Sequence, residues 1–241
     1  MLAGKILPDS TVNLTAKAAV AKNKSFELSE LLIETLGGQV TSQGKLDFSK
    51  VIEWQGYSTF SQIDPSVFWP KLQGNINGIV STNALYDNDV WIANLSKLDI
   101  NGQWQGFPIK MTGNVNYHTQ NGLKFNGISL KNAENILTLE GGASSNQQLD
   151  IQYRLNAPAL SKSLPQVKGA LNLTGKVSGT FTQPELTYDL TGTALNVSQI
   201  TVQKAKGKGF IKWNDNKPLD VKLELTDVQG NNNQIEHAYI A

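Results

Sequence analysis

Cysteine is absent from the 241 residues, so the chain can form no disulfide and offers no thiol for redox or nucleophilic chemistry. The sequence also lacks any run of about eighteen apolar residues, the length that a membrane-spanning helix requires. The segment Met1–Lys5 has no charged stretch followed by an apolar core, so it does not resemble a signal peptide. We therefore expect the chain to be an internal fragment of a longer protein.

A surplus of charge of either sign is also missing. Lys and Arg number 21 and Asp and Glu number 20, which leaves a net charge of +1. Binding to nucleic acid as the main activity requires a strong basic surplus, so we expect no nucleic-acid partner. Charged residues make up only 17% of the chain, and the amide and hydroxyl residues that replace them are typical of exported β-proteins.

Motifs that carry chemistry are lacking as well. Neither His118 nor His237 has a second ligand at metal-binding spacing, and Asp87 and Asp89 fit a turn better than a calcium loop. The sequence contains no G-x-S-x-G elbow, no dinucleotide loop and no pair of carboxylates with catalytic spacing. We predict no catalytic residue, no metal site and no cofactor, so the protein is not expected to be an enzyme.

The feature present almost everywhere is alternation of apolar and polar residues, the period of a β-strand with one apolar face. It is clearest at 107–117, 149–155, 186–190 and 219–225. These strands predict an apolar lining for lipid or a protein client. Its candidate residues are Phe107, Ile109, Met111, Val115, Leu149, Ile151, Tyr153, Leu155, Leu186, Tyr188, Leu190, Leu219, Val221, Leu223 and Leu225.

Two short helical turns interrupt the strands. Asp64-Pro65-Ser66 predicts the start of the first, and Asn156 as cap with Pro158 near the first helical position predicts the second. Pro70 and Pro165 stand 95 residues apart, and Gly74 and Gly169 show the same offset. This offset predicts approximate repeat units 40–135 and 136–228 within one elongated β segment, 1–241.

Smaller signals mark turns and one irregularity. Tyr86-Asp87-Asn88-Asp89 and Glu140-Gly141-Gly142 both have the composition of turns. The apolar residues change parity between Phe125 and Ile128, which predicts a β-bulge near Gly127.

The pattern predicts an all-β protein but leaves its architecture open. A β-sandwich would bury the apolar face against a second sheet. An elongated, curved, U-shaped sheet would leave an apolar concave face as a groove for acyl chains or apolar polypeptide. A β-solenoid adhesin would expose aromatics such as Trp54, Trp91 and Trp104, but their place on the apolar parity of their strands counts against it.

Particular segments carry a resemblance to a known family. They are Leu31–Val40 (LLIETLGGQV), Leu98–Gly106 (LDINGQWQG), and Leu155–Leu160 followed by Leu164-Pro165 and Lys168-Gly169. Together they resemble the TamB family, across most of the chain. The resemblance implies a "β-taco", a long U-shaped sheet with an apolar interior, and kinship with AsmA-like bridge-forming lipid transfer proteins.

The resemblance also implies a function. The chain would be an internal segment of a periplasmic protein that is anchored in the inner membrane and supports outer-membrane biogenesis. Its groove would carry phospholipids between the membranes, or shield nascent outer-membrane proteins during their assembly with the barrel subunit TamA, which other parts of the protein would contact. An alternative is a scaffold whose open sheet edge pairs with client strands without conducting lipid.

Overall fold

The computed structural model describes residues 13–21, 24–67, 70, 73–212, 221–230 and 233–240. Nearly all of them lie in β-strands, which confirms the predicted all-β class. The chain divides into two compact units, Met1–Thr119 and Gln120–Ala241. Each unit is described by itself below.

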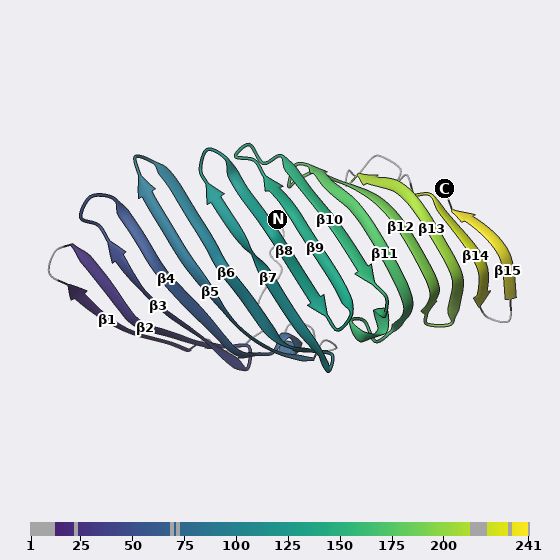
Figure 1. The fold of residues 1–241 in the computed structure, drawn as a ribbon, viewed down its shortest axis with the longest axis horizontal. Helices are drawn as coiled ribbons and strands as arrows, with labels where there is room; N and C mark the ends of the chain where they lie inside the picture. Colours follow the sequence, from purple (N-terminus) through teal and green to yellow (C-terminus); the bar gives the residue numbers. More distant parts are fainter. Residues whose placement is uncertain are drawn as a thin grey trace. The chain divides into compact units, whose positions relative to one another are not determined.

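The first unit is a single antiparallel sheet in which every strand pairs with the next one along the chain (Figure 1). This order follows from short connections, which join neighbouring antiparallel strands as hairpins. Its described strands are β1 (Asn13–Ala21), β2 (Ser25–Thr35), β3 (Gly38–Asp47), β4 (Ile52–Ile63), β5 (Gly74–Asp87), β6 (Val90–Trp104) and β7 (Phe107–His118).

The second unit repeats this plan, again with sequential antiparallel pairing. Its described strands are β8 (Gly122–Asn132), β9 (Asn135–Ala143), β10 (Leu149–Ala157), β11 (Val167–Gly179), β12 (Pro184–Val197), β13 (Ile200–Lys212), β14 (Leu223–Gly230) and β15 (Asn233–Ile240). The bulge predicted near Gly127 is confirmed, because the register of β8 against β9 shifts between Phe125 and Ile128.

The described strands of each unit form one sheet with no second sheet over it, so the β-sandwich alternative is wrong for both. Among the described residues, no large side chain is fully buried, and Trp91 and Leu95 are 48% and 42% exposed. Alternation along a strand specifies which face is apolar, but it carries no information on whether another layer covers that face. The curved, open sheet is the architecture that each unit adopts.

Two 3₁₀ turns interrupt the meander, η1 (Pro65–Val67) after β4 and η2 (Leu160–Lys162) after β10. Their bounds stand 95 residues apart, the offset found in the sequence. The residue just before each turn bonds a hairpin that lies one strand further back: the β2–β3 hairpin for η1 and the β8–β9 hairpin for η2. The Asp64 N–H donates to the Leu36 carbonyl at 2.9 Å, and the Ala159 N–H donates to Asn135 Oδ1 at 3.1 Å. The repeat boundaries at 40–135 and 136–228 stay a prediction.

The first turn begins as the sequence predicts. The Asp64 carboxylate accepts hydrogen bonds from the Ser66 N–H and the Ser66 hydroxyl, both at 2.8 Å. These donors favour the ionised carboxylate and lower the pKa of Asp64 below its ordinary value, the backbone N–H contributing most.

The predicted cap of the second turn is wrong. Asn156 belongs to β10, because its backbone pairs with Ile136 on one side and Asn172 on the other, and η2 begins only at Leu160. No side-chain hydrogen bond caps η2. Asn135 instead anchors the residue before it, because its side chain accepts the Ala159 N–H and also donates to the Ala159 carbonyl at 2.8 Å and to the Ser163 hydroxyl at 2.7 Å. Sheet pairing on both sides outweighs the local capping preference of Asn156.

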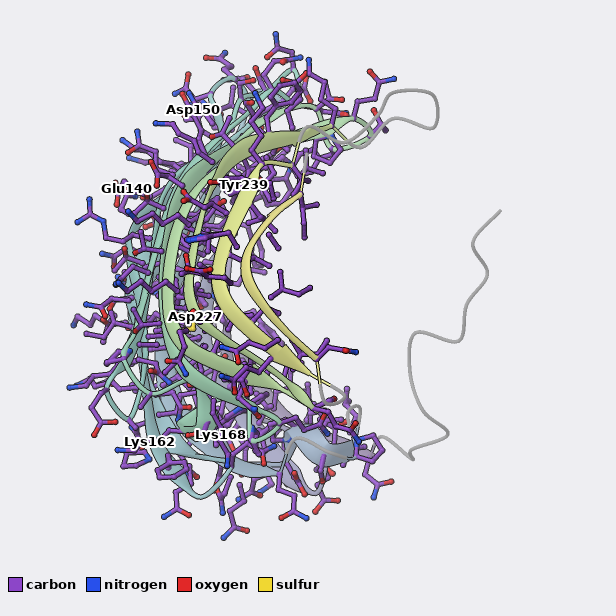
Figure 2. The ribbon with its side chains drawn as sticks, turned by 90° about the vertical axis from the view of Figure 1, so that its right-hand side faces the viewer. Glu140, Asp150, Lys162, Lys168, Asp227 and Tyr239 are labelled. Carbon is purple, nitrogen blue, oxygen red and sulfur yellow. The ribbon has the colours of Figure 1, made fainter. Side chains whose placement is uncertain are left out.

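An ion pair strengthens this contact between η2 and the β8–β9 hairpin. Lys162, at the lower end of the sheet in Figure 2, donates to both carboxylate oxygens of Glu134 at 2.6 and 2.7 Å. That hydrogen bonding lowers the pKa of the Glu134 carboxyl.

Two further expectations are corrected. Glu140-Gly141-Gly142 is not a turn but lies inside β9, where the two glycines face Ile151 and Asp150 of β10. The strand expected at 219–225 begins only at Leu223, where pairing with β13 starts, so Val221 precedes the strand. Leu219 lies outside the described residues.

Replacing Asn135 with alanine should lower the free energy of unfolding by about 1–3 kcal/mol. Asn135 is 4% exposed, and its loss leaves the Ala159 N–H and carbonyl without their partner. Urea unfolding followed by circular dichroism measures the change. Asn172→Ala, at an exposed asparagine on β11, is the matched control, and equal effects of the two variants would contradict the anchoring role of Asn135.

Asp64→Asn should destabilise the chain in a pH-dependent way. Because the folded pKa of Asp64 lies below its ordinary value of 3.8, the ionised group stabilises the fold fully above that value. The stabilisation is lost as the pH falls through the lower folded pKa. The difference in urea midpoint between wild type and variant should therefore narrow from pH 6 to pH 2. Glu53→Gln, on neighbouring β4, is the control; a difference that stays constant with pH would rule out this account.

Candidate functional site

The candidate site is the apolar face of each sheet, and the register defines it, because directly paired residues point to the same side. In the second unit, Tyr153 stands opposite Leu139 and Gly175, and Leu155 opposite Leu137 and Leu173. Each pair is uncharged. The face therefore continues from strand to strand without a break in its apolar character.

The same face extends to the last strand of the second unit. Leu190 pairs with Leu173 and Gly207, Gly207 with Leu223, and Leu223 with Ile240. Through these pairings no charged side chain joins the row. The apolar face of the second unit comprises Leu123, Phe125, Ile128, Leu130, Leu137, Leu139, Leu149, Ile151, Tyr153, Leu155, Leu171, Leu173, Val177, Leu186, Tyr188, Leu190, Ala205, Ile211, Leu223, Leu225, Ala238 and Ile240, with interspersed glycines.

The opposite face of the second unit is polar and convex. Figure 2 shows Glu140 and Asp150 on the outer side of the curved strands. The register agrees, because Glu140 stands opposite Gln152, and Gln152 shares a face with Asp150, two residues before it on β10. Cross-strand ion pairs cover this face, at 3.0 Å between Lys176 and Asp150 and 2.6 Å between Lys212 and Glu185. Because the polar face is the convex one, the apolar face lines the concave side.

The first unit has an equivalent apolar face. Met111 pairs with Ile100, Ile100 with Gly78, and Gly78 with Phe60. Trp54, Trp91 and Trp104 lie on this same side, which counts against an adhesin that displays them on the polar surface. The face comprises Val40, Leu46, Trp54, Phe60, Val80, Ala84, Tyr86, Trp91, Ala93, Leu95, Ile100, Trp104, Phe107, Ile109, Met111, Val115 and Tyr117.

Most predicted lining residues therefore lie on the apolar face of their own unit. Those from β7 belong to the first unit, and those from β10, β12 and β14 to the second. The exceptions are Val221, which precedes its strand, and Leu219, which lies outside the described residues. That this lining holds a cargo stays a prediction.

The sequence pattern missed how aromatic rings lie flat on this face. A side chain at Gly44 or Gly56 would collide with the indole of Trp54, so the ring lies across both glycines. Its Nε1–H donates to the Thr82 hydroxyl at 2.8 Å. The glycines that break the apolar alternation thus mark where a ring is received, a signal visible only once the register is known.

Tyr153 repeats this arrangement in the second unit. Its ring lies over Gly175, where an added Cβ would come within 2.5 Å of the tyrosine hydroxyl oxygen. The hydroxyl donates to the Thr187 carbonyl at 2.8 Å. Burial of the ring raises the pKa of Tyr153, because the phenolate would lose water.

The polar atoms on the apolar faces are largely paired within the protein. The Tyr188 hydroxyl accepts the Lys222 N–H at 3.0 Å, and the hydroxyls of Ser42 and Ser58 bond each other at 2.7 Å. Thr82 already accepts the Trp54 indole. These faces consequently offer few free hydrogen-bonding groups to an occupant.

On the polar face of β13, three lysines form a basic stripe, Lys204, Lys206 and Lys208. Lys208 lies 3.4 Å from the Asp189 carboxylate, and Lys206 stands opposite Glu224. The stripe is therefore balanced by acids on both neighbouring strands. Such exposed ion pairs contribute about 0–1 kcal/mol each to the stability of the fold, so their main effect is to keep this face hydrophilic.

Other chemistries find little support in the part of the chain that the structure describes. No group of three or more His, Cys, Asp or Glu side chains there could hold a metal ion. Asp89 accepts the Tyr86 hydroxyl at 2.9 Å, as befits a turn residue. No helix in the described ranges is long and apolar enough to cross a bilayer.

Comparison with known proteins adds the family to this geometry. A family model described as "TamB, N-terminal domain" matches residues 1–241. The chain belongs to the TamB family. It is similar to the translocation and assembly module subunit TamB of Haemophilus influenzae, with 24% identity over 227 residues. The alignment covers 93% of this chain but 17% of that relative. No solved structure matches the chain.

Gly175→Ala should displace the Tyr153 ring and cost about 1–3 kcal/mol of stability, whereas Tyr153→Phe, which removes only a hydrogen bond, should cost about 0.5–1.5 kcal/mol. Urea unfolding gives both values. NMR titration of the tyrosine rings should show the pKa of Tyr153 falling towards about 10 in Gly175→Ala. An unchanged pKa would mean that Gly175 does not seat the ring; Thr174→Ala is the control on the same strand.

Proposed function

We propose that this TamB-family chain supplies a segment of an apolar groove for phospholipid acyl chains within the bacterial envelope. The observation that carries the proposal is the uncharged apolar face that runs across all described strands of each unit and stays accessible to solvent. Each methylene group that moves from water onto such a surface lowers the free energy by about 0.8 kcal/mol. The face thus supplies over its whole width the environment that acyl chains need.

The hydrogen bonding of this face favours acyl chains over polypeptide. An unfolded protein brings backbone N–H and C=O groups, and moving these groups out of water without a hydrogen-bond partner is unfavourable. The polar groups on the apolar faces, such as the hydroxyls of Thr82 and Tyr153, already have partners within the chain. An acyl chain makes no such demand, so it fits a face with few free donors and acceptors.

Membership of the family supports a proposal about the surroundings of the groove. We place the chain in the periplasm, as part of a protein anchored in the inner membrane and reaching the outer membrane through segments that lie elsewhere in it. The name of the Haemophilus influenzae relative, a translocation and assembly module subunit, supports a role in outer-membrane biogenesis together with TamA. Such a role needs no catalytic side chain, because shielding the cargo is sufficient.

A second candidate function is strand templating for nascent outer-membrane proteins. Strand β15 pairs with β14 on one side and with no other described strand, and Ile235 and Ile240 on it are about half exposed. An exposed edge of this kind can bind a client strand through its backbone. In that case clients would contact β15 rather than the middle of the apolar face.

Photocrosslinking in cells separates the two functions. A crosslinking residue replaces Ile151 or Leu223 on the apolar face of the full-length protein, and Gln152 or Glu224 on the polar face serves as the matched control. Mass spectrometry identifies the adducts. We expect phospholipid to be captured at the two apolar positions and not at the two controls.

The other outcomes are equally informative. Outer-membrane protein captured without lipid, and most strongly from β15, would replace the groove proposal with strand templating. Equal lipid capture on both faces would indicate unspecific membrane contact and overturn it. A lack of adducts at Ile151 and Leu223 would mean that the apolar face is covered in the cell.

A further inference from the structure

The polar face of the first unit contains a hollow of about 860 Å³, on the side away from the proposed groove. It is lined from five consecutive strands, β2 to β6. A cavity of this size falls in the range of about 300–1,000 Å³ typical of ligand sites. Nothing in the groove proposal uses it.

Two rows of side chains line the hollow. The register aligns Glu27, Lys45, Gln55 and Asn83 in one row. A second row, two residues along each strand, contains Gln43, Tyr57, Ser81 and Ser96. Both rows point away from the side that carries Leu46 and Trp54.

Bulges frame the hollow on both sides. The register of β2 against β3 shifts between Leu28 and Leu31, and that of β6 against β7 shifts between Leu95 and Leu98. Bulges bend a strand and re-aim its side chains, and they are frequent beside binding sites. Here they lie on either side of β3, β4 and β5, which form the floor.

The chemistry of the lining is mainly neutral. Glu27 stands directly opposite Lys45, which also lies 3.8 Å from the Asp47 carboxylate, and Lys97 is the other charged residue of the lining. The two lysines and the two acids offset each other. The remaining amides and hydroxyls can both donate and accept hydrogen bonds. A ligand that matches them must likewise carry many donors and acceptors without a dominant charge.

Tyr57 gives the hollow an aromatic surface. Its hydroxyl donates to Gln43 Oε1 at 2.7 Å, which fixes the ring, while 41% of the residue stays exposed. A held ring of this kind can stack on the C–H face of a sugar, while neighbouring amides bond its hydroxyls. The exposed tyrosine and the amide row therefore present both surfaces that a sugar ring offers.

We propose that this hollow binds a neutral, hydroxyl-rich carbohydrate chain. An acyl chain would find Leu28 in the lining, but otherwise mostly amides, hydroxyls and charged groups. A polypeptide strand would find no free sheet edge, because β3, β4 and β5 are paired on both sides. A strongly anionic ligand would meet Lys45 and Lys97, but the acids Glu27 and Asp47 stand beside Lys45 and offset its charge.

The test measures binding of two soluble probes to the 241-residue chain by NMR titration. The probes are tetramers of β-1,4-linked N-acetylglucosamine and of α-1,4-linked glucose. We expect saturable shifts for at least one probe, centred on Tyr57 and Asn83. Tyr57→Ala should weaken that binding about tenfold, which equals about 1.4 kcal/mol, and Asn83→Ala should weaken it several-fold.

Tyr117→Ala is the matched control, since Tyr117 is 42% exposed in the same unit but lies on the apolar face. It should leave the affinity unchanged. Circular dichroism verifies that each variant keeps its fold, and Tyr57→Phe, which retains the ring, provides a milder variant that should weaken binding less than Tyr57→Ala. Absence of saturable binding by both probes, or binding that Tyr57→Ala and Asn83→Ala leave intact, would overturn the proposal.

Discussion

Cross-strand register is the constraint on which the remaining features of each unit depend. Because side chains alternate with a period of two, a slip of one residue between two strands would move every charge of one strand onto the apolar face. Pairs such as Leu155 with Leu173 and Arg154 with Thr174 show the two faces kept apart at adjacent positions. Bulges such as the one at Gly127 absorb local mismatches, so the separation of faces continues beyond them.

A sheet without a second layer must protect its apolar face by other means. Aromatic rings that lie flat on the sheet provide part of this protection, because they cover backbone that would otherwise meet water. The ring of Trp54 lies over Gly44 and Gly56, and the ring of Tyr153 lies over Gly175. The paired glycine and ring form a smooth surface in which the polar atom of the ring is bonded within the sheet. Tyr188, only 8% exposed on an otherwise open face, shows how far such packing can go.

The sequence was informative wherever structure follows from local pattern. The alternation at 107–117 and 149–155 predicted β7 and β10, the composition around Asn88 predicted a hairpin turn, and the change of parity predicted the bulge at Gly127. The quoted segments also led to the correct family.

Features that depend on distant partners could not be predicted. Gly141 and Gly142 have the composition of a turn, but they lie within β9, since pairing with β8 and β10 fixes them there. The turn η2 is anchored at Ala159 by Asn135, 24 residues earlier, rather than capped by the nearby Asn156. The alternation of apolar and polar residues likewise cannot tell whether a second layer covers the apolar face. Nor can it predict the hollow on the polar face, because that hollow depends on where two bulges lie.

The strictly sequential pairing of strands has a consequence for how each unit forms. Every strand finds its hydrogen-bonding partner in the segment made just before it, so ordering requires only short loops to close. A chain with this topology can grow from one end, each finished hairpin offering a template to the next segment as it becomes available. Folding can therefore advance strand by strand along the chain, and the template exposed at any moment is a single strand edge.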